Sequence, residues 1–174
     1  MSVFETERLV MRPWREDDAE NLYKYASDPE VGPAAGWPVH TSVGDSLRVL
    51  REVLIEDKTW AVTIKPSDEP VGSIGAFPTD ASGADGEPEI GYWIGRPYWG
   101  NGYIPEAVCA LIGRCFDEGA ENVWCSHFVG NDKSRRVIEK CGFRYVMTQP
   151  WQPTPDDTRD ALYYKITRKE WEHD

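Results

Sequence analysis

Two glycines stand one residue apart in the segment Arg96-Pro97-Tyr98-Trp99-Gly100-Asn101-Gly102-Tyr103. Glycine lets the backbone approach an anion closely, because no Cβ atom stands in the way. A helix predicted to follow the segment would add unpaired amide N–H groups and a partial positive charge. Together these features are those of a phosphate cradle. Tight strand-to-helix turns also use glycine for packing, so the spacing alone leaves both interpretations open.

Two common nucleotide-binding loops do not fit this segment. The dinucleotide-binding pattern G-x-G-x-x-G would need a glycine at position 105, where the chain has Pro105. A Walker loop would need Gly-Lys followed by Ser or Thr, and the chain has no such tripeptide. The ligand of a cradle here would therefore be a phosphate compound held in another way.

The elements that must position the loop follow from hydrophobic patterning and from Gly and Pro. A strand is predicted at 89–94, directly before the loop, and a helix at 104–118, with Pro105 in its first turn and Gly119 as its stop. Further strands are predicted at 8–14, 60–64, 71–77, 122–129, 143–148 and 161–167, and helices at 16–27, 43–54 and 132–141. Loops are expected at 32–38, at 79–88 and between the last two strands. This order predicts an α/β fold, a mixed sheet with helices packed on it.

Length and composition limit the classes of protein. The 174 residues fit one domain, expected over 1–174, and 40% hydrophobic with 12% aromatic residues indicate a globular chain. A net charge of -11 disfavours nucleic-acid binding and would attract cationic substrates, although acidic surfaces also serve solubility. No run approaches the roughly 20 apolar residues of a membrane helix, and no signal peptide is visible, so a cytoplasmic location without membrane contact is expected.

The cysteines and histidines indicate no metal site. The four cysteines form no CxxC pair and show no zinc-ligand spacing, and the three histidines lie far apart. Reduced and mostly buried thiols are expected, with no metal bound.

Three segments give the loop a more specific interpretation. The run E-I-G-Y-W-I-G-R-P-Y-W-G-N-G-Y-I-P-E-A resembles the acyl-CoA loop of the GNAT superfamily of N-acetyltransferases, closest to its ribosomal-protein N-terminal acetyltransferase-like branch. The run N-D-K-S-R-R-V-I-E-K-C-G-F resembles the family's second signature, and E-T-E-R-L-V-M-R-P its first strand. The matches span nearly the whole chain in the family's order. The resemblance implies a mostly antiparallel sheet whose cofactor strand splays from its neighbour.

Carried over residue by residue, the resemblance implies which positions bind acetyl-CoA. The pyrophosphate would lie against Trp99, Gly100, Asn101, Gly102 and Tyr103. The pantetheine arm would follow Tyr92, Trp93 and Ile94, and its thiol end would lie near Asn131 and Ser134. The chain departs from the family at Pro97, where Gln or Arg is frequent, and Arg96 is a candidate replacement.

Acetyl transfer needs groups that move protons. The attacking amine must lose a proton, and Glu89, at the mouth of the cofactor strand, is the first candidate base, with Glu106 second. Each has a plainer interpretation, Glu89 as a solvated carboxylate and Glu106 as a partner of the helix dipole. Ser134 matches a serine that protonates the leaving thiolate in one of the ribosomal-protein acetyltransferases, although a hydroxyl there can simply bond the backbone. The glutamate and tyrosine of another branch are replaced by Ser126 and Ile138, so that mechanism does not transfer.

The acceptor side is less defined. His127 is a candidate for the cleft, but a lone histidine is more often structural. Trp14, Tyr25 and Trp37 are candidates for lining an acceptor pocket, and Trp37 lies in the region that shapes acceptor binding in the family.

The sequence thus predicts an N-acetyltransferase that transfers the acetyl group of acetyl-CoA to a primary amine, in a monomer or homodimer. The acceptor would be a protein N-terminus or a small molecule. Two alternatives stay open: a CoA-binding sensor without catalysis, and a transferase for longer acyl groups or hydroxyl acceptors.

Overall fold

A computed structural model describes residues 2–55, 59–84, 86–154 and 156–173. The chain divides into two compact units, Met1–Gly75 with Tyr92–Ala107, and Ala76–Gly91 with Val108–Asp174. The divisions fall inside strands β4 (Pro70–Pro78) and β5 (Pro88–Ile94) and inside helix α4 (Tyr103–Asp117). Each unit is therefore built from two stretches of chain, and the single domain stays a prediction.

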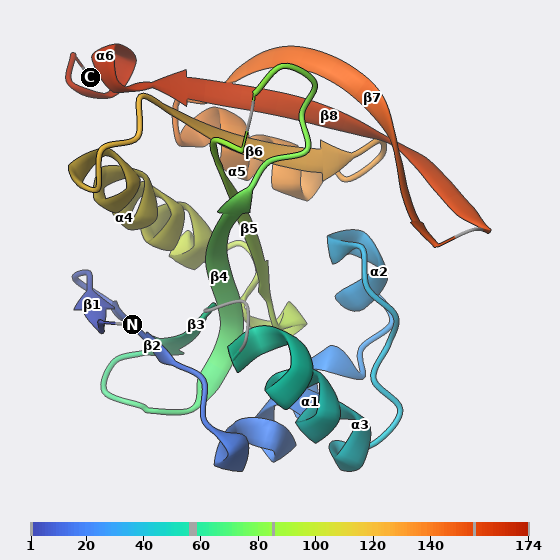
Figure 1. The fold of residues 1–174 in the computed structure, drawn as a ribbon. Coiled ribbons are helices and arrows are strands. Elements are labelled where there is room, and N and C mark those ends of the chain that lie inside the picture. Colours follow the sequence, from blue (N-terminus) through green and yellow to red (C-terminus); the bar gives the residue numbers. More distant parts are fainter. Residues whose placement is uncertain (1, 56–58, 85, 155, 174) are drawn as a thin grey trace. The chain divides into compact units, whose positions relative to one another are not determined.

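The strands are hydrogen-bonded in the order β1-β2-β3-β4-β5-β6-β8-β7 (Figure 1). The other bounds are β1 Phe4–Glu5, β2 Leu9–Pro13, β3 Trp60–Ile64, β6 Asn122–Phe128, β7 Arg144–Thr154 and β8 Asp157–Thr167. Among the pairs whose register is described, β5 with β6 is parallel and the rest are antiparallel. The predicted mixed, mostly antiparallel α/β sheet is confirmed.

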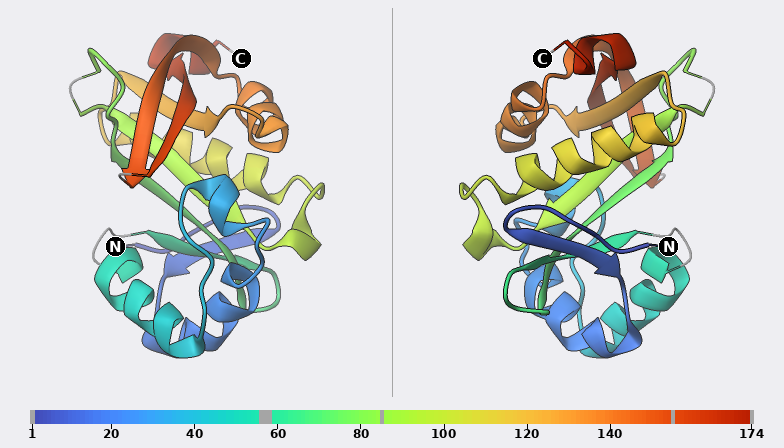
Figure 2. Two further views of the ribbon diagram at one scale, coloured as in Figure 1. Left: turned by 90° about the vertical axis from the view of Figure 1, so that its right-hand side faces the viewer. Right: turned by 90° about the vertical axis from the view of Figure 1, so that its left-hand side faces the viewer.

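The helices of the first unit follow β2. A 3-10 turn at Glu16–Asp18 leads into α1 (Ala19–Ala26), and α2 (Gly32–Ala35) and α3 (Val43–Val49) come next. Ser42 caps α3, because its side chain accepts a hydrogen bond from the amide of Asp45. A π-helical turn at Leu50–Ile55 continues α3. In both views of Figure 2, α1 (blue) and α3 (teal) lie side by side below β2 and β3.

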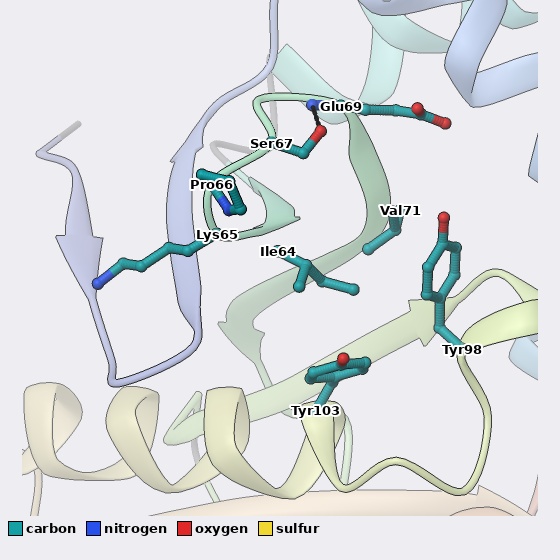
Figure 3. A pocket seen from close by; sticks show the side chains of 8 residues that line it. All are labelled: Ile64, Lys65, Pro66, Ser67, Glu69, Val71, Tyr98 and Tyr103. Atoms are coloured by element: carbon teal, nitrogen blue, oxygen red, sulfur yellow. Dashed lines mark hydrogen bonds between the residues drawn. The ribbon is translucent and has the colours of Figure 1, made fainter.

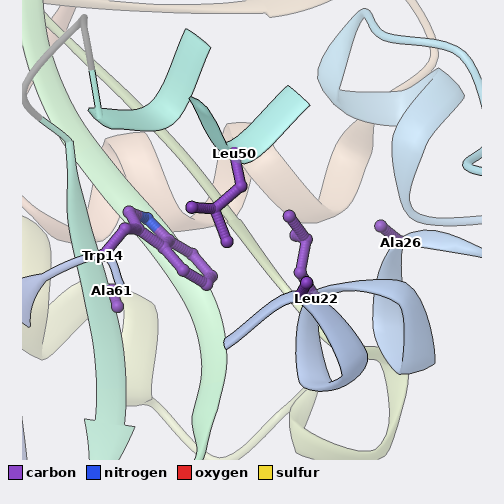
Figure 4. Packing of buried hydrophobic residues seen from close by; sticks show 6 residues of the cluster. Trp14, Leu22, Ala26, Leu50 and Ala61 are labelled. Carbon is purple, nitrogen blue, oxygen red and sulfur yellow. The ribbon is translucent and has the colours of Figure 1, made fainter. Parts of the chain in front are cut away.

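These helices bury an apolar core against β3. The cluster comprises Trp14, Ala19, Leu22, Ala26, Leu50 and Ala61 (Figure 4). The predicted stripe on 43–54 is confirmed in part: Leu50 is fully buried and Leu47 and Leu54 pack on the cluster, but Val43 is 39% exposed. Val43 is the first residue of α3 and lies at the edge of this contact.

One predicted loop contains a helix. Residues 32–38 were expected to be irregular because of their Gly and Pro content, yet α2 occupies the first four of them. Pro33 stands in the first turn, where its missing N–H costs nothing, and Gly36 ends the helix at a φ of 91°. The same residues that indicate a loop therefore begin and end a short helix.

The second unit packs a long hairpin on β6. Helix α5 (Asp132–Lys140) follows β6, and α6 (Arg168–Trp171) follows β8. The expected loop at 149–160 is wrong for its described residues, because β7 and β8 stay paired through Gln149↔Ala161 and Trp151↔Arg159 (Figure 1). Trp151 packs on Phe128, with ring centroids 4.8 Å apart, and this contact extends the hairpin despite Pro150.

The remaining predicted elements agree with the structure within a few residues. Helix α4 carries Pro105 in its first turn, and Gly119 follows it at a φ of 101°. Cys115, Cys125 and Cys141 are buried and Cys109 is half-buried, and no disulfide joins any two of them in the described part of the chain. Over the described ranges, no helix is long and apolar enough to cross a membrane. The connection predicted at 79–88 is irregular, with residue 85 outside the described residues.

A buried ion pair joins β2 to the turn before α1. The guanidinium of Arg12 donates two hydrogen bonds of 2.8 Å to Asp18, and both side chains are less than 10% exposed. Arg12 also donates to Asp68 at 2.7 Å. Because charges out of water need a partner, this contact constrains how α1 enters the core.

We expect Arg12→Leu to destabilise the protein by about 3–5 kcal/mol, because it leaves the Asp18 carboxylate buried without its partner. Urea unfolding at pH 7 measures the loss. Arg15→Leu is the control: its ion pair with Asp68 is more than half exposed on both sides and should contribute less than about 1 kcal/mol. The double variant Arg12→Leu/Asp18→Leu should recover part of the loss, and an equal cost for both single variants would contradict the interpretation.

Candidate active site

The loop between β5 and α4 contains two residues in the left-handed conformation. After β5 ends at Ile94, Arg96–Tyr98 forms one 3-10 turn. Gly100 and Gly102 then have φ values of 77° and 78°, and α4 begins at Tyr103. Only glycine adopts such a conformation readily, and it orients the amides at the start of α4 to form a concave backbone surface.

The space beside these glycines separates the two interpretations of the loop. A Cβ added at Gly100 would meet no atom of the described residues within 4 Å, and one at Gly102 would meet the Arg8 guanidinium at 3.5 Å. At Gly95, by contrast, a Cβ would lie 2.5 Å from the Tyr25 ring. Gly95 is thus a packing glycine, whereas Gly100 leaves room that a ligand can occupy. The geometry fits a phosphate cradle.

Two side chains of the loop stabilise its own shape. The indole Nε1 of Trp99 donates to the carbonyl of Ile94 at 2.9 Å. The amide Nδ2 of Asn101 donates to the carbonyls of Tyr98 and Trp99, both at 3.1 Å. The residues predicted to hold pyrophosphate are therefore adjacent, and Trp99 and Asn101 use these side-chain donors to shape the backbone.

An ion pair between Arg8 and Glu106 stabilises the loop between β5 and α4. Arg8 contacts Glu106 at 2.6 Å, donates to the carbonyl of Asn101 at 3.0 Å and lies over the ring of Tyr103, 4.7 Å from its centroid. Thr6 donates a further hydrogen bond to Glu106 at 2.5 Å. Glu106 is thus a structural carboxylate in the first turn of α4.

Behind the loop lies a hollow of about 270 Å³ (Figure 3). Its walls are formed by Ile64, Lys65, Pro66, Ser67, Glu69, Val71, Tyr98 and Tyr103. The hydroxyl of Tyr98 lies 3.0 Å from that of Tyr25, which donates to Glu69 at 2.7 Å. Tyr98 and Tyr103 thus form the side of the hollow that belongs to the segment between β5 and α4.

The strand that enters the loop is partly enclosed by aromatic side chains. Trp93 stacks on Trp14 with centroids 6.4 Å apart and meets Trp37 edge-on at 5.6 Å. Trp14 is 5% exposed, and Tyr25 is buried to the same extent, whereas Trp37 stays half-buried. Of the three acceptor candidates, Trp37 is the one that this unit leaves partly open to solvent.

Glu89 lies in the second unit, where both of its carboxylate oxygens accept hydroxyl hydrogen bonds. Ser126 donates to Oε1 at 2.5 Å and Thr79 to Oε2 at 2.6 Å. Burial raises the pKa of Glu89, the hydrogen bonds from Ser126 and Thr79 lower it, and the charge of Asp80 raises it again, with a net upward shift. A carboxylate with a raised pKa is suited to proton transfer near neutral pH.

Asn131 and Ser134 lie together at the start of α5. The side-chain oxygen of Asn131 accepts the amide hydrogen of Ser134 at 3.1 Å, which makes Asn131 the N-cap of the helix. Both side chains are half-buried. The capping contact gives the pair a structural role, and their contact with the cofactor stays a prediction.

The weaker candidates have structural partners. Arg96 was a candidate to replace the Gln or Arg that is frequent in the family at the position of Pro97. Its guanidinium pairs with Glu30 at 3.2 Å, and its replacement role stays a prediction. His127 is 7% exposed, and its ring nitrogens contact the carbonyl of Phe128 at 2.9 Å and the hydroxyl of Tyr164 at 3.3 Å. His127 is therefore a satisfied structural histidine.

Sequence reasoning missed Arg8 as the fastening residue and Thr79 and Asp80 as neighbours of Glu89. Arg8 lies within a segment that resembles the family, and this was the available signal. The hydrogen bond from Thr79 to Glu89 could not be read from the Gly/Asp-rich segment that contains Thr79, because it depends on the path of that segment in the folded protein.

The chain was compared with protein families and with known proteins. Residues 8–144 match the family model described as the acetyltransferase (GNAT) domain. This chain belongs to the GNAT acetyltransferase family. An N-acetyltransferase named p20 from Bacillus licheniformis is 34% identical over 121 residues, 67% of each chain. YdaF of Bacillus subtilis, whose provisional name is ribosomal N-acetyltransferase, is 37% identical over 86 residues, 48% of this chain and 47% of its own.

Solved structures agree on the fold. A GNAT-family acetyltransferase from Bacillus anthracis has a TM-score of 0.81 at 24% identity and covers 97% of this chain and 99% of its own. The microcin C7 self-immunity acetyltransferase MccE, solved with acetyl-CoA and AMP, has a TM-score of 0.74 at 19% identity, with 93% of each chain covered. The present chain is an acetyl-CoA-dependent N-acetyltransferase, with acetyl-CoA as co-substrate.

We expect Glu106→Gln in this GNAT domain to lower stability at pH 7 by up to about 1 kcal/mol, since its partner Arg8 is 44% exposed. Burial acts to raise the pKa of Glu106, but the hydrogen bonds from Thr6 and Arg8 outweigh it and the pKa is lowered. The stabilisation is thus present above the ordinary value of 4.5 and is lost as pH falls through the folded value.

Urea unfolding at pH 7 and near pH 4 measures this difference. The gap between wild type and Glu106→Gln should narrow at the lower pH. Glu118→Gln, which removes an exposed pair with Arg114, is the control and should have a smaller effect at both pH values. An equal loss for Glu106→Gln at both pH values would show that the ion pair is not the cause.

Proposed function

We propose that this acetyltransferase acetylates a primary amine, either at a protein N-terminus or on a small molecule. The observation that carries the proposal is the open backbone cradle at Gly100 and Gly102. A Cβ added at Gly100 would meet no described atom within 4 Å, and one at Gly102 would meet only the Arg8 guanidinium, at 3.5 Å. The N-acetyltransferase name of p20 favours nitrogen over oxygen as the acceptor atom. The ribosomal name of YdaF favours a protein amine, and it covers half of this chain.

The loop would hold the cofactor through backbone groups. The amides of Gly100, Asn101 and Gly102, with those at the start of α4, suit a pyrophosphate because they need little reorganisation. Trp99 and Tyr103 would border it, and the backbone of Tyr92, Trp93 and Ile94 would pair with the amide arm. Asn131 would contact the far end of that arm. When bound, acetyl-CoA supplies an acetyl thioester.

Two side chains would move the protons. Glu89 accepts the proton that the amine nitrogen loses as its lone pair forms the new C–N bond. Ser134 gives its hydroxyl proton to the sulfur as the C–S bond breaks, and regains one from solvent. Glu89 returns its proton to solvent, so the neutral amine and acetyl-CoA give an N-acetyl amine and free CoA thiol with atoms and charges balanced. Ser134 lies in the first turn of α5, where its backbone amide donates to the side chain of Asn131.

The charge of the protein favours a cationic acceptor. With a net charge of -11, the surface potential attracts protonated amines and basic peptides. Such an acceptor arrives as an ammonium ion and must lose one proton to solvent before it can attack; the neutral amine then loses a second proton, to Glu89, as the C–N bond forms. A base of raised pKa is therefore the group this acceptor needs.

We expect Gly100→Trp to abolish acetyl-CoA binding, because the indole would fill the cradle and displace the pyrophosphate. Isothermal titration calorimetry with acetyl-CoA measures it. Gly119→Trp is the matched control: Gly119 also has a positive φ and open space around it, so it carries the same backbone strain of about 1–2 kcal/mol away from the loop. Normal acetyl-CoA affinity in a folded Gly100→Trp variant would refute the loop assignment.

We expect Glu89→Gln to lower turnover by about 10²–10⁴-fold, the usual contribution of a general base. Release of CoA thiol from acetyl-CoA in the presence of small amines and basic N-terminal peptides measures turnover, and unchanged acetyl-CoA affinity confirms an intact donor site. Full turnover in this variant would exclude Glu89 as the base. Tight acetyl-CoA binding by the wild type, with no thiol release on any acceptor, would favour the sensor alternative.

A further inference from the structure

The carboxylate of Glu89 accepts hydrogen bonds from two different segments of the chain. Ser126 comes from the parallel neighbour β6, where the ladder pairs Glu89 with Trp124, and Thr79 comes from the connection between β4 and β5. Each hydroxyl contacts a different carboxylate oxygen, at 2.5 and 2.6 Å. Two donors on two oxygens restrict rotation of the carboxylate plane more than either could alone.

The direction of the Thr79 hydrogen bond is determined by a second contact. The hydroxyl oxygen of Thr79 accepts the amide hydrogen of Ala81 at 3.1 Å, so its own hydrogen is available to Glu89. Thr79 is 8% exposed, and its amide donates to the carbonyl of Glu87 at 2.8 Å. The hydroxyl is thus oriented before any substrate arrives.

The connection that carries Thr79 is itself anchored. Tyr163, 1% exposed, donates to the carboxylate of Asp80 at 2.6 Å, and Gln149 donates to the carbonyl of Asp80 at 3.0 Å. At its other end, Glu87 accepts hydrogen bonds of 2.5 Å from Trp124 and from Asn122. The connection is held at both ends against β6 and the β7–β8 hairpin.

These contacts also determine the charges near Glu89. Among the described residues of this unit, the charge of Asp80 acts on Glu89, and Tyr163 on β8 is in turn affected by the charge of Glu89. Glu87 stands two residues before Glu89, and the ammonium of Lys165 on β8 lies 5.3 Å from the ring centroid of Trp124, the ladder partner of Glu89. Asp80 repels the ionised form of Glu89, and the two hydroxyls stabilise it. The hydroxyl donors and the neighbouring carboxylate therefore act in opposite directions.

We propose that Thr79 and Ser126 are positioning residues for Glu89, the base. Their hydroxyls orient the Glu89 carboxylate and stabilise its ionised form, whereas Asp80 destabilises that form. The inference rests on the proposed function, in which Glu89 accepts the amine proton. Neither hydroxyl contacts the reacting atoms. Their contribution is that the base presents the same oxygen lone pairs to every substrate, while Asp80 keeps it basic enough to accept a proton.

The first test follows the titration of Glu89 itself and needs no acceptor. Carboxyl-¹³C glutamate NMR identifies the Glu89 signal by its loss in Glu89→Gln. In Thr79→Val and Ser126→Ala the pKa should rise, because a donor to the charged form is lost. In Asp80→Asn it should fall, because a like charge is lost. Thr79→Ser, which keeps the hydroxyl, should match the wild type.

The second test is the pH dependence of thiol release with the most active amine of the panel. The acid limb should move to higher pH in Thr79→Val and to lower pH in Asp80→Asn. On that limb, loss of one donor to a charged group should lower kcat/KM about tenfold. Thr79→Ser should restore it, and a merely structural role for Thr79 would lower activity evenly at all pH values.

The outcomes separate this inference from the proposed function. Shifts of the same sign in Thr79→Val and Asp80→Asn, or none in either, would overturn the inference even in an active enzyme. The pKa of Glu89 could shift in opposite directions in Thr79→Val and Asp80→Asn while the Glu89→Gln variant stays fully active. This result would uphold the effect of the neighbours on the ionisation of Glu89. It would refute the role of Glu89 as the base, and with it any catalytic role of the two hydroxyls.

Discussion

The shape of the loop between β5 and α4 depends on the ion pair between Arg8 and Glu106. Two glycines in the left-handed conformation have no side chains with which to pack, so the loop between them needs support from its surroundings. Arg8 supplies it at three points: the Glu106 carboxylate, the carbonyl of Asn101 and the ring of Tyr103. The residue that precedes β2 and the first turn of α4 are thereby joined beside the two loop glycines.

In the proposed function, this arrangement would bind an anion in a protein that is itself strongly acidic. The nearby cations are already paired, Arg8 with Glu106 and Arg96 with Glu30. The positive potential at the loop therefore comes mainly from backbone N–H groups and the start of α4. Such groups are fixed by the fold and need no rearrangement when a phosphate arrives. An acidic surface that attracts amines can thus coexist with a site for a pyrophosphate.

The parts of the fold that depend on neighbours in sequence could be predicted, and those that depend on distant contacts could not. Strand β3, the loop glycines and the stop at Gly119 follow from local residue types. The extended β7–β8 hairpin was missed because Pro150 indicates a loop, whereas the packing of Trp151 on Phe128 holds the strands together. Glu89 was predicted as the base from its place at the start of the strand before the loop, and that role stays a prediction. Its hydroxyl partners could not be predicted, since Thr79 is brought to it by the path of the connection between β4 and β5.

Two glutamates of this protein show how the same side chain acquires different chemistry. Glu106 accepts hydrogen bonds from a guanidinium, a hydroxyl and an amide, which lower its pKa and leave a weak base that serves structure. Glu89 accepts from two neutral hydroxyls, while burial and Asp80 raise its pKa. A cation beside Glu89 would orient it equally well but would also remove its affinity for a proton. Neutral donors orient the carboxylate and lower its pKa only in part, so burial and Asp80 still leave the pKa of Glu89 raised, which is what proton transfer from an amine requires.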